Sequence, residues 1–164
     1  MNKSFRAFAE EIAREAGQLL LRYQRDGVEV ESKSNEIDLV TSADRASEAL
    51  LIDRIQSRFP THQILAEEDG SIGDQSSDLR WVIDPLDGTV NFAHGQPHFC
   101  VLVSLEQREG TGWESIACAT FDPHRDEMFS AASGEGAWLN GGLLQVSPTA
   151  SLRDACGATG VPYG

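Results

Sequence analysis

The most informative stretch of the sequence is residues 81–92, Trp81-Val82-Ile83-Asp84-Pro85-Leu86-Asp87-Gly88-Thr89-Val90-Asn91-Phe92. It begins as an apolar run typical of a buried strand. It continues into a tight turn, because Pro85 fixes φ at the first turn position and Gly88 tolerates the dihedral angles at the exit. Two carboxylates three residues apart across such a turn, Asp84 and Asp87, can face one cavity, and the carbonyl oxygen of Leu86 can point there as well. Mg²⁺ prefers oxygen ligands of this kind, so the stretch predicts a candidate magnesium site.

Two interpretations of this turn remain open from the residues alone. In the first, Gly88 and Thr89 open a short helix whose free N–H groups receive a phosphate oxygen, and the Thr89 hydroxyl orients a water molecule. In the second, Asp-Pro-x-Asp-Gly is only favourable turn chemistry, because aspartate, proline and glycine each suit tight turns.

The charge balance limits the classes of partner. The chain has 164 residues, with 26 acidic and 13 basic side chains and a net charge of −13. Binding to a phosphate backbone needs clustered Lys and Arg, and the only lysines are Lys3 and Lys33, so we expect neither nucleic acid nor an anionic membrane as a partner. An acidic protein that handles an anionic substrate would recruit a divalent cation. The acidity is equally explained as a surface that keeps the chain soluble.

The length and the cysteines indicate a single intracellular domain. A chain of 164 residues corresponds to one domain, and no apolar run approaches the roughly 18 residues of a membrane span. No basic and apolar leader opens the chain. Three cysteines at unrelated spacings form neither a disulfide framework nor a zinc site. We therefore expect a cytoplasmic protein.

The remaining pattern predicts an α+β fold with two N-terminal helices packed on a largely antiparallel sheet. The helices are expected over residues 4–23, capped by Ser4 and stopped by Gly27, and over residues 42–59, capped by Ser42. The second helix would bury a stripe of Ala46, Leu50, Ile52 and Ile55. Strands are expected at 28–32, 37–40, 63–66, 81–83, 99–106, 114–121, 127–131, 137–139 and 143–146. A hairpin is expected at Asn140-Gly141-Gly142, and residues 67–77 are expected to form a mobile loop.

Other reactive side chains are expected to have structural roles. Cys100 and Cys118 lie in apolar strand patterns, which indicates buried thiols rather than nucleophiles. His94 and His98 are separated by Gly95 and Pro97, so no helix aligns them as zinc ligands.

Residues 81–92 resemble the signature of the inositol monophosphatase family of Mg²⁺-dependent, lithium-sensitive sugar phosphatases, with the core Asp84-Pro85-Leu86-Asp87-Gly88-Thr89. The resemblance extends in order along nearly the whole chain. It includes Lys33-Ser34 with the stretch 38–44, residues 64–68, where Ala66 replaces the usual glycine, and residues 134–146. The chain is identified as a member of this family, and it matches the first half of the layered αβαβα sugar-phosphatase fold.

The resemblance implies the metal ligands. Glu67, Asp84 and Asp87 would bind Mg²⁺ through their side chains, and Leu86 would bind it through its carbonyl oxygen. One cation would activate the attacking water and another would stabilise the leaving alkoxide. Because clustered carboxylates repel one another, we expect the site to be loose until magnesium orders it.

The resemblance also implies the catalytic and substrate-binding residues. Asp44 and Thr89, together with Glu67, would activate the attacking water. Asp87, Gly88 and Thr89 would bind the substrate, with the backbone N–H groups of the last two directed at the phosphate. Lys33 would lean toward the site, although a surface lysine on an edge strand would look the same in the sequence.

The expected substrate is myo-inositol 1-phosphate or a similar small phosphorylated sugar or cyclitol. Asn91-Phe92 followed by His94-Gly95 resembles the inositol monophosphatase branch of the family. Relatives are dimeric, so a homodimer is expected.

The sequence departs from the family pattern in its second half. Family members continue into a second α/β half with a Trp-Asp-x-Ala-x-Gly motif, whose Asp is a further metal ligand, and here the three Trp precede Val82, Glu114 and Leu139. We expect a metal- and phosphate-binding domain over residues 1–147 and the start of a truncated second domain over 148–164. The alternative function is therefore an inactive remnant that acts at most as a metal-binding or interaction domain.

Overall fold

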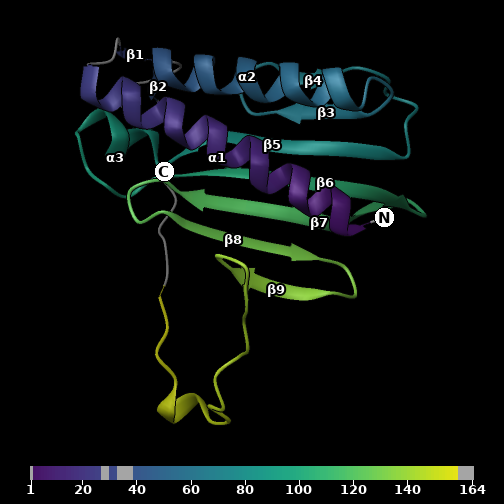
Figure 1. The fold of residues 1–164 in the computed structure, drawn as a ribbon, viewed down its shortest axis with the longest axis vertical. Coiled ribbons are helices and arrows are strands. Elements are labelled where there is room, and N and C mark those ends of the chain that lie inside the picture. The colour runs from purple at the N-terminus through teal and green to yellow at the C-terminus, as the bar shows by residue number, and fades with distance from the viewer. Residues whose placement is uncertain (1, 27–29, 33–38, 159–164) are drawn as a thin grey trace.

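The computed structural model describes residues 2–26, 30–32 and 39–158. Its main feature is an eight-stranded sheet in the order β10-β9-β8-β7-β6-β5-β3-β4, with the helices α1 (Asn2–Asp26) and α2 (Ser42–Arg58) lying across one face (Figure 1). The strands of this sheet are β3 (Gln63–Ala66), β4 (Gly70–Ile72), β5 (Leu79–Asp87), β6 (Cys100–Glu109), β7 (Gly112–Asp122), β8 (Glu127–Ala132), β9 (Gly136–Leu139) and β10 (Gly142–Leu143).

The strand pairing confirms the predicted α+β class. Six of the seven pairs in the large sheet are antiparallel, and only β3 and β5 run parallel. A separate antiparallel pair joins β1 (Val30–Ser32) to β2 (Leu39–Thr41). The predicted antiparallel sheet and the packing of two N-terminal helices on it are both confirmed.

The predicted helix caps need two corrections. The first helix begins at Asn2, before the expected cap Ser4, and it continues to Asp26. The second helix is capped by Thr41, whose side chain accepts hydrogen bonds from the backbone N–H groups of Ala43 and Asp44. Ser42 is the first helical residue, because the extended conformation of Thr41 places its hydroxyl over the free N–H groups.

The predicted buried stripe of α2 is wrong except at Ile55. Ala46, Leu50 and Ile52 are only half-buried. The buried face carries polar as well as apolar side chains, namely Ala43, Asp44, Ser47, Glu48, Leu51 and Ile55. A search for apolar periodicity alone misses such a face.

The expected loop over residues 67–77 is also wrong in part. It contains β4, which pairs with β3 so that Ala66 lies opposite Gly70 and Glu67, Glu68 and Asp69 form a hairpin turn. At the other edge of the sheet the predicted β9–β10 hairpin is confirmed, with Asn140 and Gly141 at φ of 50° and 78°. The last strand ends at Leu143 rather than at residue 146.

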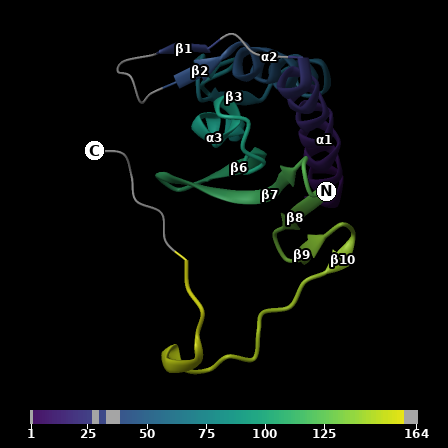
Figure 2. The same cartoon turned by 90° about the vertical axis from the view of Figure 1, so that its left-hand side faces the viewer.

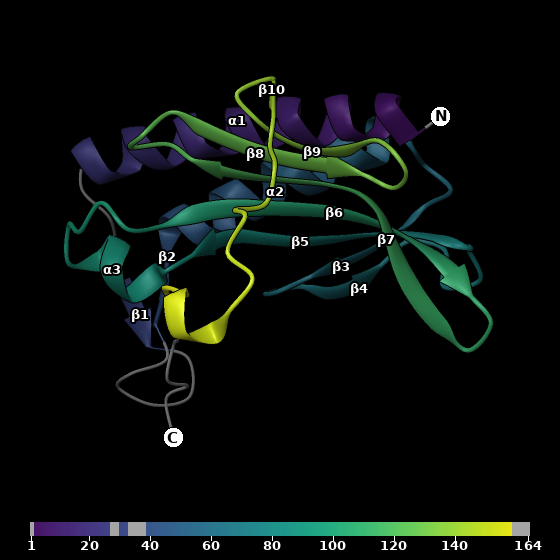
Figure 3. The ribbon, with the colours of Figure 1, turned by 90° about the horizontal axis from the view of Figure 1, so that it is seen from below.

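The core lies between the sheet and the two helices. Trp81, Val101, Leu105 and Leu20 are fully buried there. Seen from below, α1 and α2 both lie behind the strands (Figure 3). Cys100 and Cys118 lie on strands whose alternate residues face the core, and both thiols are half-buried rather than buried as expected.

After β10 the chain leaves the sheet as an extended segment with one short 3-10 turn, Leu152–Asp154 (Figure 2). Residues 144–158 are exposed, and the domain boundary at 147 stays a prediction. Gly27, Lys33, the first residues of both early strands and residues 159–164 lie outside the described part. Within that part no helix is long and apolar enough to cross a membrane.

Candidate metal and phosphate site

A bulge in β5 places Asp84 and Asp87 together. Asp84 pairs with Leu102 and Asp87 with Cys100, so β5 advances three residues while β6 advances two. Side chains three apart on a regular strand point to opposite faces, and the extra residue returns them to the same side. The tight turn expected at Pro85 is therefore a bulge, and β5 continues through it to Asp87.

Two hydrogen bonds hold the bulge in place. The Asp84 carboxylate accepts one from the Leu86 N–H at 3.1 Å. The Ser47 hydroxyl, from α2, donates one of 2.9 Å to the carbonyl oxygen of Pro85. Both bonds satisfy backbone groups that the interrupted ladder leaves unpaired.

The parallel pairing of β3 with β5 brings Glu67 to the same place. Ala66 lies opposite Ile83, so Glu67, the first residue after β3, follows at the level of Asp84 in β5. Burial raises the pKa of Asp84 to about 7, and the carboxylates of Glu67 and Asp87 add to this shift. The three predicted acidic ligands are therefore close enough to interact electrostatically.

Asp44 connects α2 to the segment after the bulge. Its carboxylate is 1% exposed; one oxygen accepts hydrogen bonds from the N–H and hydroxyl of Thr41 at 2.8 and 2.6 Å, which completes a capping box. The other oxygen lies 3.0 Å from the Thr89 hydroxyl. The same hydroxyl lies 3.0 Å from the carbonyl oxygen of Leu86.

Gly88 opens the short helix α3 (Thr89–Ala93), as expected. Its φ of +94° is in the left-handed region, and a Cβ there would lie 2.7 Å from the carbonyl oxygen of His98. Only glycine fits this position, since any side chain would meet backbone atoms.

The donor set suits a hard divalent cation. Three carboxylates and a backbone carbonyl are the oxygen ligands that Mg²⁺ selects, and a cation would offset the repulsion that raises the pKa of Asp84. Within residues 2–26, 30–32 and 39–158 no group of three or more His, Cys, Asp or Glu side chains is arranged to hold a metal ion. The ligand roles of Glu67, Asp84, Asp87 and Leu86, and the ordering of the site by magnesium, therefore stay predictions.

Three further residues lie around the site and were not predicted from the sequence to belong to it: Ser47, Glu48 and Cys100. Ser47 and Glu48 are buried on α2 beside Asp44, and the thiol of Cys100 donates to the Asp87 carboxylate at 3.5 Å. Ser47 and Glu48 follow Asp44 by three and four residues on one helix, and this spacing is the signal that could have identified them.

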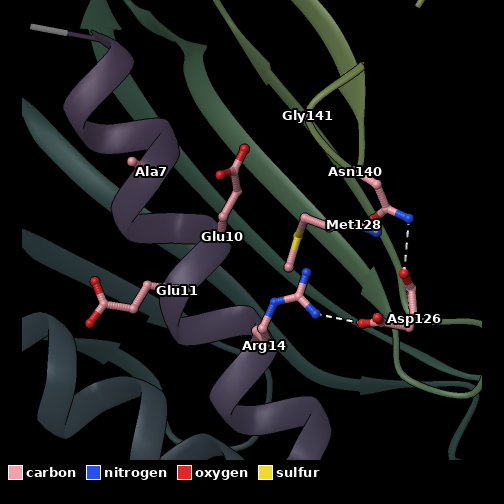
Figure 4. A pocket seen from close by; sticks show the side chains of 8 residues that line it. All are labelled: Ala7, Glu10, Glu11, Arg14, Asp126, Met128, Asn140 and Gly141. Atoms are coloured by element: carbon pink, nitrogen blue, oxygen red, sulfur yellow. Dashed lines mark hydrogen bonds and ion pairs between the residues drawn. The ribbon is translucent and has the colours of Figure 1, made fainter. Parts of the chain in front are cut away.

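Two of the surface pockets formed by the described residues bear on the location of the site. One of about 370 Å³ adjoins the bulge and is lined in part by Asp87, Gly88, His98 and Arg125. Another of about 580 Å³ lies between α1 and the β8–β9 region, where Arg14 and Asp126 form an ion pair (Figure 4). No predicted site residue lines this second pocket, whereas Asp87 and Gly88 line the first.

Comparison with known proteins agrees with this geometry. The chain is 41% identical over 153 residues to the Nus factor SuhB of Escherichia coli K12. The match covers 92% of this chain and 55% of that protein. The chain thus spans about half the length of the curated relatives that it matches.

Solved structures share the fold. The extragenic suppressor protein suhB of Bartonella henselae has a TM-score of 0.81 at 32% identity and covers 89% of this chain and 55% of its own. The inositol monophosphatase of Anabaena (Nostoc) sp. PCC 7120 has a TM-score of 0.75 at 39% identity, with 90% and 51% covered. An IMPase/NADP phosphatase complexed with Mg²⁺ and phosphate has a TM-score of 0.72 at 28% identity, with 83% and 51% covered.

The profile described as "Inositol monophosphatase family" matches residues 1–164. The carboxylates that the fold gathers at the ends of β3 and β5 are those that the resemblance implied as ligands. The chain therefore belongs to the inositol monophosphatase family.

Proposed function

We propose that this chain carries the magnesium and phosphate site of a phosphomonoesterase, a hydrolase that acts on a small sugar or cyclitol phosphate such as myo-inositol 1-phosphate. The observation that carries the proposal is the meeting of Glu67, Asp84 and Asp87 beside the hydrogen-bonded pair Thr89–Asp44. The family and the Mg²⁺ and phosphate complex of a structural neighbour support it.

In this proposal Glu67, Asp84, Asp87 and the carbonyl oxygen of Leu86 hold the magnesium. When bound, the cation supplies acidity for the attacking water and positive charge for the leaving oxygen. The backbone N–H groups of Gly88 and Thr89 bind the phosphate, and Asp87 contacts the substrate.

The pair Thr89–Asp44 prepares the water. The Thr89 hydroxyl has one proton and two acceptors at 3.0 Å, the carboxylate of Asp44 and the carbonyl oxygen of Leu86. Donation to Asp44 keeps the Leu86 oxygen available as a ligand and leaves the lone pairs of Thr89 ready to accept a proton from water. Asp44 and Thr89 act as the base relay, and Glu67 orients the water beside them.

The test uses the 164-residue chain. Calorimetry measures Mg²⁺ binding, and phosphate release from inositol 1-phosphate is followed with and without magnesium, with an additional lithium arm. Magnesium binding with lithium-inhibited turnover supports the full proposal. A folded chain that binds no magnesium refutes it.

Binding without turnover favours the second candidate, a metal-binding domain that is inactive by itself. The observation behind this candidate is that the chain covers 55% of the length of its curated relatives. The cytoplasmic location and the homodimer remain predictions. The expected absence of a nucleic-acid partner is also a prediction, since the curated relatives bear the name Nus factor.

A further inference from the structure

The helix α2 buries three polar side chains in succession on the face toward the site. Asp44, Ser47 and Glu48 are 1%, 0% and 2% exposed. Acidic residues are almost never fully buried unless their oxygens are paired. Each of these side chains therefore needs a hydrogen-bond partner, and that partner identifies the segment that the side chain fixes in place.

The three partners belong to three different segments of the candidate site. Asp44 accepts from Thr89, after the bulge, and Ser47 donates to the carbonyl oxygen of Pro85, within the bulge. Glu48 accepts from the backbone of the β3–β4 turn. One helix face thus fixes every backbone segment that carries a predicted ligand.

The contact of Glu48 has no role in the proposed mechanism. One carboxylate oxygen accepts from the N–H of Glu68 at 3.0 Å, and the other accepts from the N–H of Asp69 at 3.0 Å. These are the two residues directly after the ligand Glu67. A carboxylate that accepts from two successive backbone N–H groups fixes the path of that turn, because such bonds are directional and charge-assisted.

We propose that Glu48 is a positioning residue for the metal centre: by holding the N–H groups of Glu68 and Asp69 it fixes the turn that presents Glu67 beside Asp84. This role rests on the proposed magnesium site. Groups behind metal ligands orient them in advance, and their loss costs about 10–100-fold in metal affinity. A residue that only stabilised the hairpin would change the unfolding temperature without changing the affinity of the folded protein.

The experiment compares Glu48→Gln with the parent chain. The amide keeps the size of the side chain but offers one acceptor oxygen, and its NH₂ group faces the second backbone N–H. Glu10→Gln is the matched control, because Glu10 also accepts two hydrogen bonds, from Arg6 and Ser130 at 2.7 and 2.6 Å, on the other long helix. Calorimetry measures the Kd for Mg²⁺, and NMR hydrogen exchange measures the protection of the amides of Glu68 and Asp69.

We expect Glu48→Gln to raise the Kd for Mg²⁺ about tenfold or more and to speed exchange at Glu68 and Asp69, whereas Glu10→Gln changes neither. An unchanged Kd for folded Glu48→Gln overturns the positioning role, whatever the exchange shows. Glu48→Asp keeps the charge with a shorter reach and gives the same comparison if the glutamine variant does not fold. If the parent chain binds no Mg²⁺, the proposed function fails, and unchanged exchange at the two amides then overturns the Glu48 contact separately.

Discussion

The glycine at the start of α3 gives the sharpest test of the site's backbone. Gly88 has a φ of +94°, and an added Cβ would lie 2.7 Å from the carbonyl oxygen of His98 and 3.3 Å from Cα of Phe99. Gly88→Ala therefore combines two costs, a left-handed backbone conformation and a collision with backbone atoms that have no side-chain freedom to move away.

The matched control is Gly110→Ala. Gly110 has a φ of +58° and no atom within 4 Å of an added Cβ, so it measures the conformational cost alone. That cost is about 1–2 kcal/mol. Overpacking adds about 1–3 kcal/mol at Gly88. The entropy that alanine removes from the unfolded chain is the same in both variants and cancels in the comparison.

Thermal unfolding followed by circular dichroism measures the difference. A loss of 1 kcal/mol lowers the Tm of a chain of this size by about 2–4 °C. We expect a decrease of about 2–8 °C for Gly110→Ala and of about 4–20 °C for Gly88→Ala on the same scale. Equal decreases in the two variants would refute the close approach of Gly88 to the His98 backbone.

Three further outcomes are expected. Asp44→Asn leaves one acceptor oxygen where the capping box and Thr89 each use one, and its NH₂ group faces a donor. We expect it to lower the free energy of unfolding in urea by about 2–3 kcal/mol. Asp53→Asn, exposed on the same helix, changes that free energy by less than about 0.5 kcal/mol, and similar losses in the two variants would remove Asp44 from the network. Asp87→Ala weakens Mg²⁺ binding in calorimetry at least about tenfold, with Asp78→Asn as control, and parent-like binding would exclude Asp87 as a ligand. Burial lowers the pKa of His62, whose Nδ1 accepts from the Trp81 N–H at 3.1 Å. The unfolded chain therefore protonates His62 more readily than the folded chain does. The stability that neutral His62 contributes is present above its unfolded pKa of about 6.5 and is lost as the pH falls through the lower folded value. We expect urea to unfold the parent chain more easily as the pH falls from about 7.5 to 5, and an equally steep dependence in His62→Gln would contradict this.

The fold could be predicted from the sequence where local chemistry decides it. The apolar run before Asp84, the Asn140-Gly141 turn and the short helix after Gly88 depend on residues close in the chain, and the structure contains all three. The stretch after Glu67 was predicted as a loop because its residues are polar, and it forms β4 because β3 supplies a pairing partner. Long-range pairing of this kind leaves little trace in local composition.

The candidate site likewise has one part that could be predicted from the sequence and one part that could not. The candidate ligands were proposed from resemblance to a motif, but their approach to one another depends on the parallel register of β3 with β5 and on the bulge opposite β6. The buried polar face of α2 was missed, since Asp44, Ser47 and Glu48 have the spacing of a buried stripe without its hydrophobicity.

The position of these contacts along the chain has a consequence for biosynthesis. The hydrogen bonds of the site join segments from Thr41 to Thr89, and β6, which defines the bulge, is the next strand. Chains emerge from the ribosome N-terminal end first, so these contacts can form before β7 to β10 have been made. The helix α1 packs on α2 and β6 but also on β7 and β8, so the part of its apolar face that meets the last two strands stays uncovered until they are made. During synthesis, the apolar surface between α1 and the later strands is therefore exposed to aggregation after the turns that carry the candidate ligands have already formed their hydrogen bonds.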